Sequence, residues 1–133
     1  MEVFESADLT LETTRRDLAR AIIAMFDRWG LSSDQRMELL SLSPGQRKTL
    51  NQYRCGQRAL PLTRDALDRA GLLLGIYRGL RDLFPEDQAL RLTWIRRRNR
   101  LLDQFSPLDI MMRDGLIGVF RIARLVESQV AES

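Results

Sequence analysis

The chain has 133 residues, a mass of 15.4 kDa, 44% apolar residues and a formal net charge of +3. This length fits one domain or two very small ones, and the apolar share is enough for a buried core. Because it has no histidine and only one cysteine, Cys55, the chain cannot form an intrachain disulfide, a cysteine zinc site or a histidine-based acid–base centre.

Motifs that carry chemistry or targeting are also missing. The sequence lacks the glycine-rich loops that bind phosphate and the HExxH motif of zinc enzymes, so we predict no enzyme, no catalytic residue, no cofactor and no metal. Residues 1–10 hold three acids and no base, unlike a secretory signal. The longest apolar run, 72–77, is too short to cross a bilayer, and we therefore predict a cytoplasmic protein.

Three helices are predicted in the first half of the chain. Apolar residues three and four positions apart place a helix over about 12–29. A capping-box spacing opens a short helix from 33 to about 40. After a tight connection, Ser43 caps a helix that runs from Pro44 to about 54. Two short helices joined in this way form the helix-turn-helix pattern.

The second short helix is predicted to present a polar, basic face to solvent, while Leu42, Leu50 and Tyr53 face the core. Residues 41–64 include five bases and no acid, whereas residues 1–30 have a net charge of −2. Amide and basic side chains on such a helix bind base edges and phosphates in a major groove. The alternative is an ordinary solvated helix face. The residues predicted to contact DNA are Gln46, Arg47, Lys48, Asn51, Gln52 and Arg54.

A long helix is predicted over 64–84. Its second half is apolar around most of its circumference, which a helix on the surface of a small monomer cannot be. We therefore expect it to be the central helix of the fold and part of a homodimer contact. The residues predicted to form that contact are Leu73, Ile76, Tyr77 and Leu80.

The last third of the chain is predicted to be helical but interrupted. A helix restarts after Pro85 and leads into a basic run, 96–100, followed by an irregular loop. Ser106 and Pro107 then have the spacing of a helix start, and Gly115 breaks the helix they open. A final amphipathic helix is expected from 116 to about 126, with a frayed tail. Its predicted buried side is Val119, Phe120, Ile122, Ala123 and Val126.

The fold class that follows is all-α. An N-terminal helix-turn-helix-like bundle, 1–63, is expected to pack through the connecting helix, 64–84, on a small helical C-terminal domain, 85–133.

From about residue 31 to 126 the order of three motifs resembles the Xre/MbcA/ParS group of antitoxins, which neutralise toxins carrying a RES domain. The first is Tyr53-Arg54-Cys55-Gly56-Gln57, where the family often has Trp in place of Tyr53. The second is the leucine-rich stretch from Asp65 to Phe84. The third and most specific is Trp94, then Asn99-Arg100-Leu101-Leu102, Ser106-Pro107-Leu108-Asp109 and Asp114-Gly115.

Two positions depart from the family pattern. The family often has proline before the asparagine, where this chain has Arg98. The family usually has a small, glycine-containing loop before Ser-Pro, where this chain has Leu102-Asp103-Gln104-Phe105. The departures leave the expected fold unchanged but put the shape of this loop in question.

The resemblance implies a type II toxin–antitoxin role and a mechanism. Partner toxins of this family consume NAD or transfer ADP-ribose, and the C-terminal region of the antitoxin blocks the toxin's active site. The front domain represses the operon where it keeps its DNA binding, within a hetero-oligomeric complex. The residues expected to bind the toxin are Arg97, Arg98, Asn99, Arg100, Ser106, Pro107 and Asp109.

The residues themselves leave alternatives open. Arginines beside a break in helical structure suit an interface because their planar guanidinium groups pair with carboxylates and are enriched at binding hot spots. The same arginines could instead be a solvated helix end or a second nucleic-acid patch. The competing function is a stand-alone helix-turn-helix transcriptional repressor whose C-terminal half only dimerises.

Overall fold

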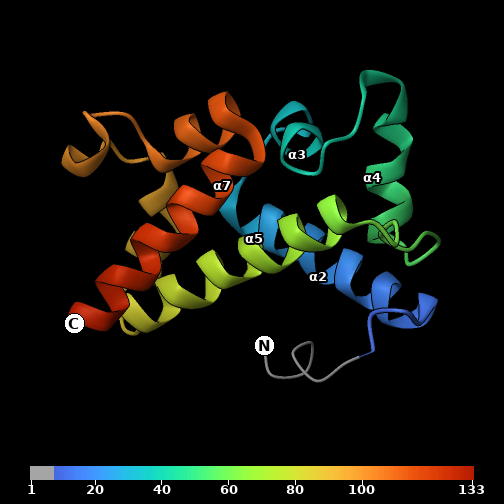
Figure 1. Ribbon diagram of the computed structural model, residues 1–133, viewed down its shortest axis with the longest axis horizontal. Helices are drawn as coiled ribbons and strands as arrows, with labels where there is room; N and C mark the ends of the chain where they lie inside the picture. The colour runs from blue at the N-terminus through green and yellow to red at the C-terminus, as the bar shows by residue number, and fades with distance from the viewer. Residues whose placement is uncertain (1–7) are drawn as a thin grey trace. The chain divides into compact units, whose positions relative to one another are not determined.

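The computed structural model describes residues 8–133, which form six α-helices and three short 3₁₀ helices (Figure 1). No strand occurs in this part of the chain, so the all-α prediction is confirmed. The chain divides into two compact units, 1–74 and 75–133, which are treated separately below. Within the described residues, no helix combines the length and apolar character needed to cross a membrane.

The first unit is built on α2, Glu12–Trp29, which buries one continuous side in its core. Ile22 and Phe26 on that side are fully buried. The helix ends at Gly30, whose φ of 66° is the left-handed conformation that glycine adopts without steric cost. The predicted bounds of this helix are confirmed.

The two short helices α3, Ser33–Leu39, and α4, Arg47–Arg54, follow as predicted (Figure 1). Ser32 and Gln35 form the capping box at the start of α3. The connection passes through Ser41, whose φ is 58°, and through a 3₁₀ turn, η1, at Pro44–Gln46. Helix α4 packs against both α2 and α3. This is the helix-turn-helix arrangement.

Helix α4 is anchored by two buried side chains, Tyr53 and Thr49. The sequence predicted the burial of Tyr53, which is 2% exposed. It did not predict the burial of Thr49, and it overstated the burial of Leu42 and Leu50, which are only half-buried. Because the helix has eight residues and few apolar ones, its position depends on these few contacts.

The long helix α5, Arg64–Leu83, begins in the first unit and continues into the second. Leu73, Ile76 and Leu80 are at most 1% exposed within one chain, and Tyr77 is half-buried. A single chain already covers Leu73, Ile76 and Leu80. The apolar surface of this helix is therefore not a reason to expect a dimer, which corrects the argument from the sequence. A homodimer stays a prediction.

The second unit holds α6, Gln88–Thr93, two 3₁₀ helices, η2 at Trp94–Arg96 and η3 at Arg100–Leu102, and α7, Pro107–Glu132. The first helix after Pro85 starts only at Gln88, where Asp87 caps it by accepting a hydrogen bond from the Leu90 amide. Within this unit, α5 and α7 pack closely, and an added Cβ at Gly79 would overlap the Val126 side chain.

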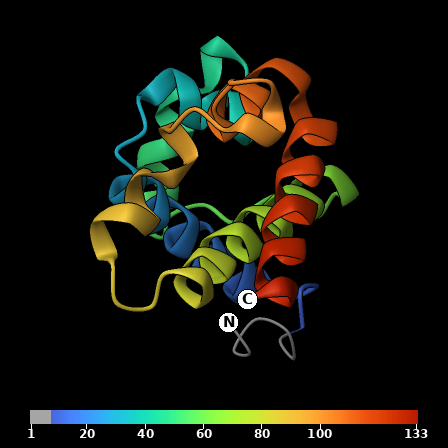
Figure 2. The ribbon, with the colours of Figure 1, turned by 90° about the vertical axis from the view of Figure 1, so that its left-hand side faces the viewer.

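Helix α7 bends sharply at Gly115, whose φ of 64° and ψ of −140° are not helical (Figure 2). The predicted break is therefore confirmed. Two expectations for the last segment are wrong. The helix continues to Glu132 rather than fraying from 127, and Phe120, predicted to be buried, is 50% exposed.

Candidate DNA-binding and partner-binding surfaces

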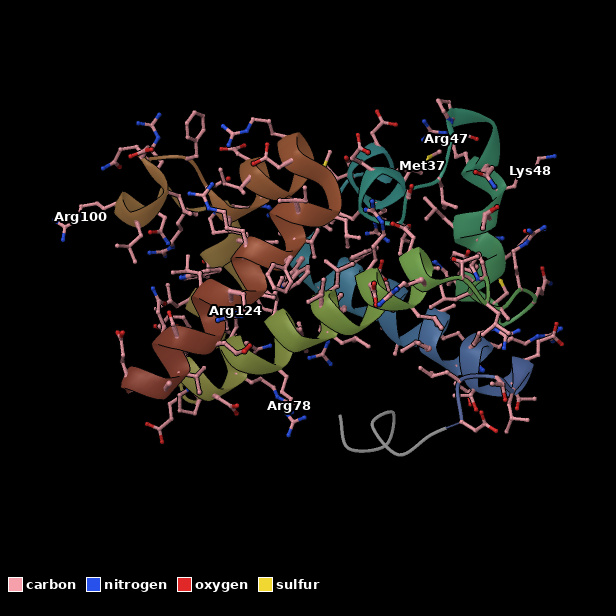
Figure 3. The ribbon with its side chains drawn as sticks, in the orientation of Figure 1. Met37, Arg47, Lys48, Arg78, Arg100 and Arg124 are labelled. Carbon is pink, nitrogen blue, oxygen red and sulfur yellow. The ribbon has the colours of Figure 1, made fainter. Side chains whose placement is uncertain are left out.

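The outer face of α4 and its preceding turn carry the residues predicted to contact DNA. Gln46, Arg47, Lys48 and Asn51 are exposed, as predicted, while Gln52 is half-buried. Lys48 projects away from the helix (Figure 3). Its ammonium group has no ion-pair partner within residues 8–133. These side chains can reach an external ligand without any rearrangement of the fold.

Two of these side chains also organise the turn before α4. The Gln46 side-chain oxygen accepts hydrogen bonds from the Ser43 amide at 2.9 Å and the Ser43 hydroxyl at 3.1 Å, which leaves its amide protons available. Arg47 forms an ion pair with Asp34 of α3 at 2.9 Å. Both partners of that pair are more than half exposed, so it stabilises the fold little and a phosphate can compete for Arg47.

Arg54 is bound within the first unit by more hydrogen bonds than Arg47, although its side chain is 49% exposed. It donates two hydrogen bonds to the Asp27 carboxylate, at 2.6 and 3.0 Å. Arg36 donates a third to the same carboxylate at 2.7 Å. Asp27 therefore joins α2, α3 and the end of α4. Arg54 positions the helix, and a DNA contact from it stays a prediction.

In the second unit, Asn99 organises the loop that follows the arginine run. Its side chain accepts a hydrogen bond from the Leu101 amide at 2.9 Å, and its backbone bonds to Phe105 and Gln104 close the loop. Asp103 and Gln104 have φ values of 53° and 70°. This is a conformation that glycine favours. The loop thus adopts a glycine-like backbone without glycine.

Three residues of the predicted toxin-binding surface lie at the start of α7. Ser106 and Pro107 are buried. Ser106 and Asp109 bond to each other's backbone amides at 3.0 Å in a reciprocal capping box. The start of the helix explains these residue types, and a toxin contact from Ser106, Pro107 or Asp109 stays a prediction.

The arginines before this loop are accessible. Arg97, Arg98 and Arg100 are exposed and have no ion-pair partner in the described part of the chain. Arg100 projects away from the loop in Figure 3. Two apolar side chains on the same loop are also exposed, Leu101 at 66% and Phe105 at 46%. Exposed apolar groups beside unpaired arginines are typical of a protein-binding surface.

A second exposed apolar region lies on α7 beyond the bend. Ile117 is 78% exposed and Phe120 is 50% exposed. Arg124 lies over the Phe120 ring at 5.9 Å, and Arg113 lies over the Phe105 ring at 5.3 Å. Two exposed rings of the second unit, Phe105 and Phe120, are therefore each covered on one face by a guanidinium group.

Comparisons with known proteins find a family that the first unit resembles. Residues 13–75 match the family described as the antitoxin Xre-like helix-turn-helix domain. The uncharacterized protein y4oB of Sinorhizobium fredii (strain NBRC 101917 / NGR234) is 33% identical over 109 residues, which cover 82% of this chain and 81% of that protein. The chain belongs to the family of y4oB, and we call its residues 13–75, which match the Xre-like model, the Xre-like domain. No solved structure matches it.

The Xre-like domain contains the α3–α4 helix pair and ends at residue 75, beside the boundary between the two compact units. The Asp27 cluster lies inside it. The Arg54 hydrogen bonds, together with those of Arg36, lower the pKa of Asp27 from 3.8 to about 2. A charged Asp27 thus stabilises the folded domain.

Asp27→Asn is expected to destabilise the Xre-like domain by about 1 kcal/mol at neutral pH. The shift in pKa alone would give about 2.4 kcal/mol, but the Asp27 side chain is 41% exposed and solvent screening reduces this. Because the folded pKa is depressed, this contribution is present above pH ~4 and is lost as the pH falls towards 2. Urea unfolding at several pH values measures both effects.

The matched control for that variant is Asp34→Asn. Asp34 is also paired with an arginine of α4, but both groups are largely exposed, so we expect almost no change in stability. Equal destabilisation by the two variants would contradict a special role for Asp27.

Proposed function

We propose that this protein is the antitoxin of a type II toxin–antitoxin pair. Its second unit binds a RES-domain toxin and blocks the active site in which the toxin consumes NAD or transfers ADP-ribose. Its Xre-like domain binds the operator through α4 and represses the pair's own promoter. A homodimer of this chain, within a larger complex with the toxin, supplies two copies of the DNA-binding helix.

The observation that carries this proposal is the combination of two parts in one chain. Residues 13–75 match the model of an antitoxin helix-turn-helix family. The unit that follows exposes apolar side chains and unpaired arginines that its own fold does not use. Exposing Leu101 and Ile117 to water is unfavourable. A stand-alone repressor whose second unit binds no other protein would not need these exposed apolar side chains.

The chemistry of the exposed loop suits a toxin that handles an anionic dinucleotide. A guanidinium group presents several donors in a fixed plane and pairs with carboxylates in two parallel hydrogen bonds. Arg98 and Arg100 stand on either side of Asn99, whose own side chain fixes the loop backbone. The arginines are thus held on an ordered support, which reduces the entropy lost on binding.

Co-expression tests the proposal directly. The reading frame beside this chain is first checked for a RES-domain protein, which would be the candidate toxin, and that protein is then expressed from an inducible plasmid. We expect growth arrest when the toxin is expressed alone and restored growth when this chain is added. A stand-alone repressor would have no RES-domain neighbour, or would fail to restore growth while still repressing its promoter.

The DNA-binding part is tested by Arg47→Ala with Lys48→Ala. If both side chains contact phosphates, we expect roughly a 10-fold weaker affinity for the operator at physiological salt. The slope of log affinity against log salt should fall in magnitude by about 2. A mobility-shift titration at several salt concentrations measures both quantities.

Restoration of growth by the same double variant provides the control, because the toxin-binding surface lies elsewhere in the chain. Unchanged operator binding would remove the DNA role from α4. Loss of growth restoration together with unchanged DNA binding would contradict the division of roles between the two units.

A further inference from the structure

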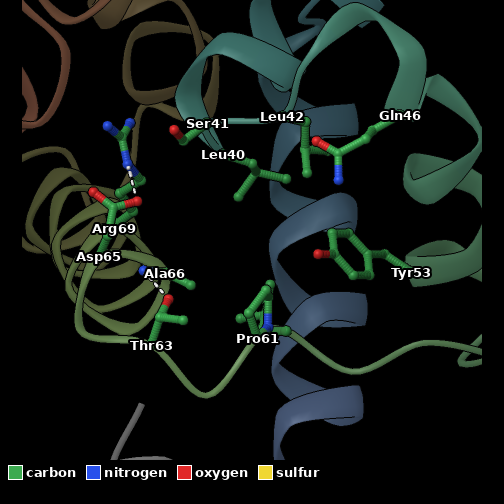
Figure 4. Close-up of a pocket in the computed structure, with 11 residues that line it drawn as sticks. Leu40, Ser41, Leu42, Gln46, Tyr53, Pro61, Thr63, Asp65, Ala66 and Arg69 are labelled. Atoms are coloured by element: carbon green, nitrogen blue, oxygen red, sulfur yellow. Dashed lines mark hydrogen bonds and ion pairs between the residues drawn. The ribbon is translucent and has the colours of Figure 1, made fainter.

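A cavity of about 180 Å³ lies within the first unit, on the inner side of α4 (Figure 4). Its walls come from the turn between α3 and α4, from α4 itself, from the 60–63 loop and from the start of α5. An engineered protein cavity of about 150 Å³ is large enough to bind benzene. The volume is therefore sufficient for a molecule with one six-membered ring or a branched body of similar size.

The floor of the cavity contains a polar group without a partner. Tyr53 is 2% exposed, and its hydroxyl has no hydrogen-bond partner within residues 8–133. In Figure 4 the hydroxyl points away from α4 towards the space bounded by Leu40 and Pro61. Because the hydroxyl lines an open cavity, a ligand with a donor or acceptor at this place can form a hydrogen bond with it in place of water.

The remaining wall groups define which ligand fits. Leu40, Leu60 and Ala66 supply apolar contacts. The two charged groups, Asp65 and Arg69, are paired with each other at 2.9 Å, and Arg69 also donates to the Leu39 carbonyl at 3.1 Å. The wall is thus close to neutral. An uncharged ligand loses less hydration than an ion on entering such a site, so the chemistry favours it.

The mouth of the cavity is open to solvent. Ser41, Thr63 and Pro61 line it and are exposed, whereas Tyr53, Leu60 and Arg69 at its floor are buried. A ligand can therefore enter without unfolding the domain. Its polar end would lie near the Tyr53 hydroxyl, and its apolar body against the leucine side chains.

We propose that this cavity binds a small uncharged molecule with an apolar ring or branched body and one hydroxyl or amide group. Gln46 and Tyr53 line the cavity from the segment whose other face carries Arg47 and Lys48. A bound ligand stabilises the present arrangement of α3 and α4, because it contacts α4 and the turn that joins the two helices. Any resulting effect on operator affinity rests on the proposed DNA binding, whereas ligand binding itself does not.

The experiment uses the full chain and four probes of equal ring size: benzyl alcohol, benzamide, benzoate and benzylammonium. Two-dimensional amide NMR titration, without DNA, gives the dissociation constants and the residues affected. We expect the two neutral probes to saturate with dissociation constants of about 1 mM or below, in the range of small fragments. The amide signals of Gln46, Tyr53 and Ala66 should shift, and the two charged probes should bind at least about 10-fold more weakly.

Variants locate the site. Ala66→Leu fills the cavity and should weaken binding of benzyl alcohol at least about 10-fold, while Ala24→Leu, at an exposed position of α2, should leave it unchanged. Tyr53→Phe keeps the ring and removes only the hydroxyl, and should weaken binding about 3-fold, the effect of one hydrogen bond. It serves as the test if Ala66→Leu does not fold.

Three results would overturn the proposal: no saturation by either neutral probe, which means that the cavity holds only water; equal binding of charged and neutral probes; or unchanged affinity in both Ala66→Leu and Tyr53→Phe. Operator binding is measured separately with and without benzyl alcohol. A chain that binds the probe but not DNA would contradict the DNA-binding proposal and leave the cavity proposal standing.

Discussion

Gly118→Ala is expected to destabilise the second unit by about 3 kcal/mol, because a methyl group has no room there. An added Cβ would overlap the carbonyl oxygen of Ile110 and would lie 3.0 Å from the Asp114 Cβ. The obstructing atoms belong to backbone before the bend at Gly115, so no side-chain rotation can relieve the contact. The two parts of α7 would have to separate, which breaks the packing of buried residues on both sides of the bend.

Gly75→Ala is the matched control, since this glycine is also helical and nothing lies within 4 Å of its added Cβ. Alanine has the higher helix propensity, so this variant should be stabilised by about 1 kcal/mol. Urea unfolding followed by circular dichroism measures both. A Gly118→Ala protein as stable as the parent would show that the bend is not packed as described.

Helix starts were predictable from sequence because capping is local chemistry. Ser32 and Ser106 each form a reciprocal capping box with a residue three positions later, as their spacing predicts. The bend in α7 was predictable for the same reason, since Asp114-Gly115 interrupts an otherwise helical pattern. These features depend on neighbouring residues only.

Features that depend on distant residues were not predictable. Arg54 looked like a free base on the DNA-binding face, but its partner Asp27 is 27 positions earlier in the chain. No pattern in one sequence links the two positions. A charge count therefore overestimates the free positive charge of this face.

The error at Phe120 arises within the part of α7 that follows the bend. Phe120 and the buried residues Val119, Ile122 and Val126 are all apolar and lie within about two helical turns. That part has apolar residues on more than one side, and the period alone cannot decide which side is buried. Ile117 was not identified as a surface residue for the same reason, although a second apolar side on a helix is itself a signal of a binding surface.

The expected dimer contact on α5 shows a related limit. An all-round apolar helix must be covered, but the sequence does not say by what. Leu73 and Ile76 have no exposed surface within one chain. The sequence thus predicted that these residues are buried, but it could not decide whether their own chain or a second copy covers them.

Arg98→Glu combined with Arg100→Glu is expected to abolish toxin neutralisation without affecting the fold. Both side chains are exposed and carry no ion pair in the part of the chain that the structure describes, so reversing their charge removes no internal contact. If they pair with carboxylates of the toxin, the variant places like charges together at the interface. Such a change weakens the binding free energy by about 2–5 kcal/mol for each buried charge pair. The lower value corresponds to about a 30-fold loss of affinity for the toxin.

Growth measurements test this, with the toxin and the antitoxin expressed from separate promoters so that repression does not affect the result. Arg58→Glu combined with Arg81→Glu is the control, because it makes the same change in net charge at two exposed positions outside the loop. We expect growth arrest with the loop variant and normal growth with the control. Equal thermal stability of the two variants would show that the loss arises at the interface. Normal growth with the loop variant would mean that the arginines beside Asn99 do not bind the toxin, and would leave Leu101, Ile117 and Phe120 as the exposed groups to test next.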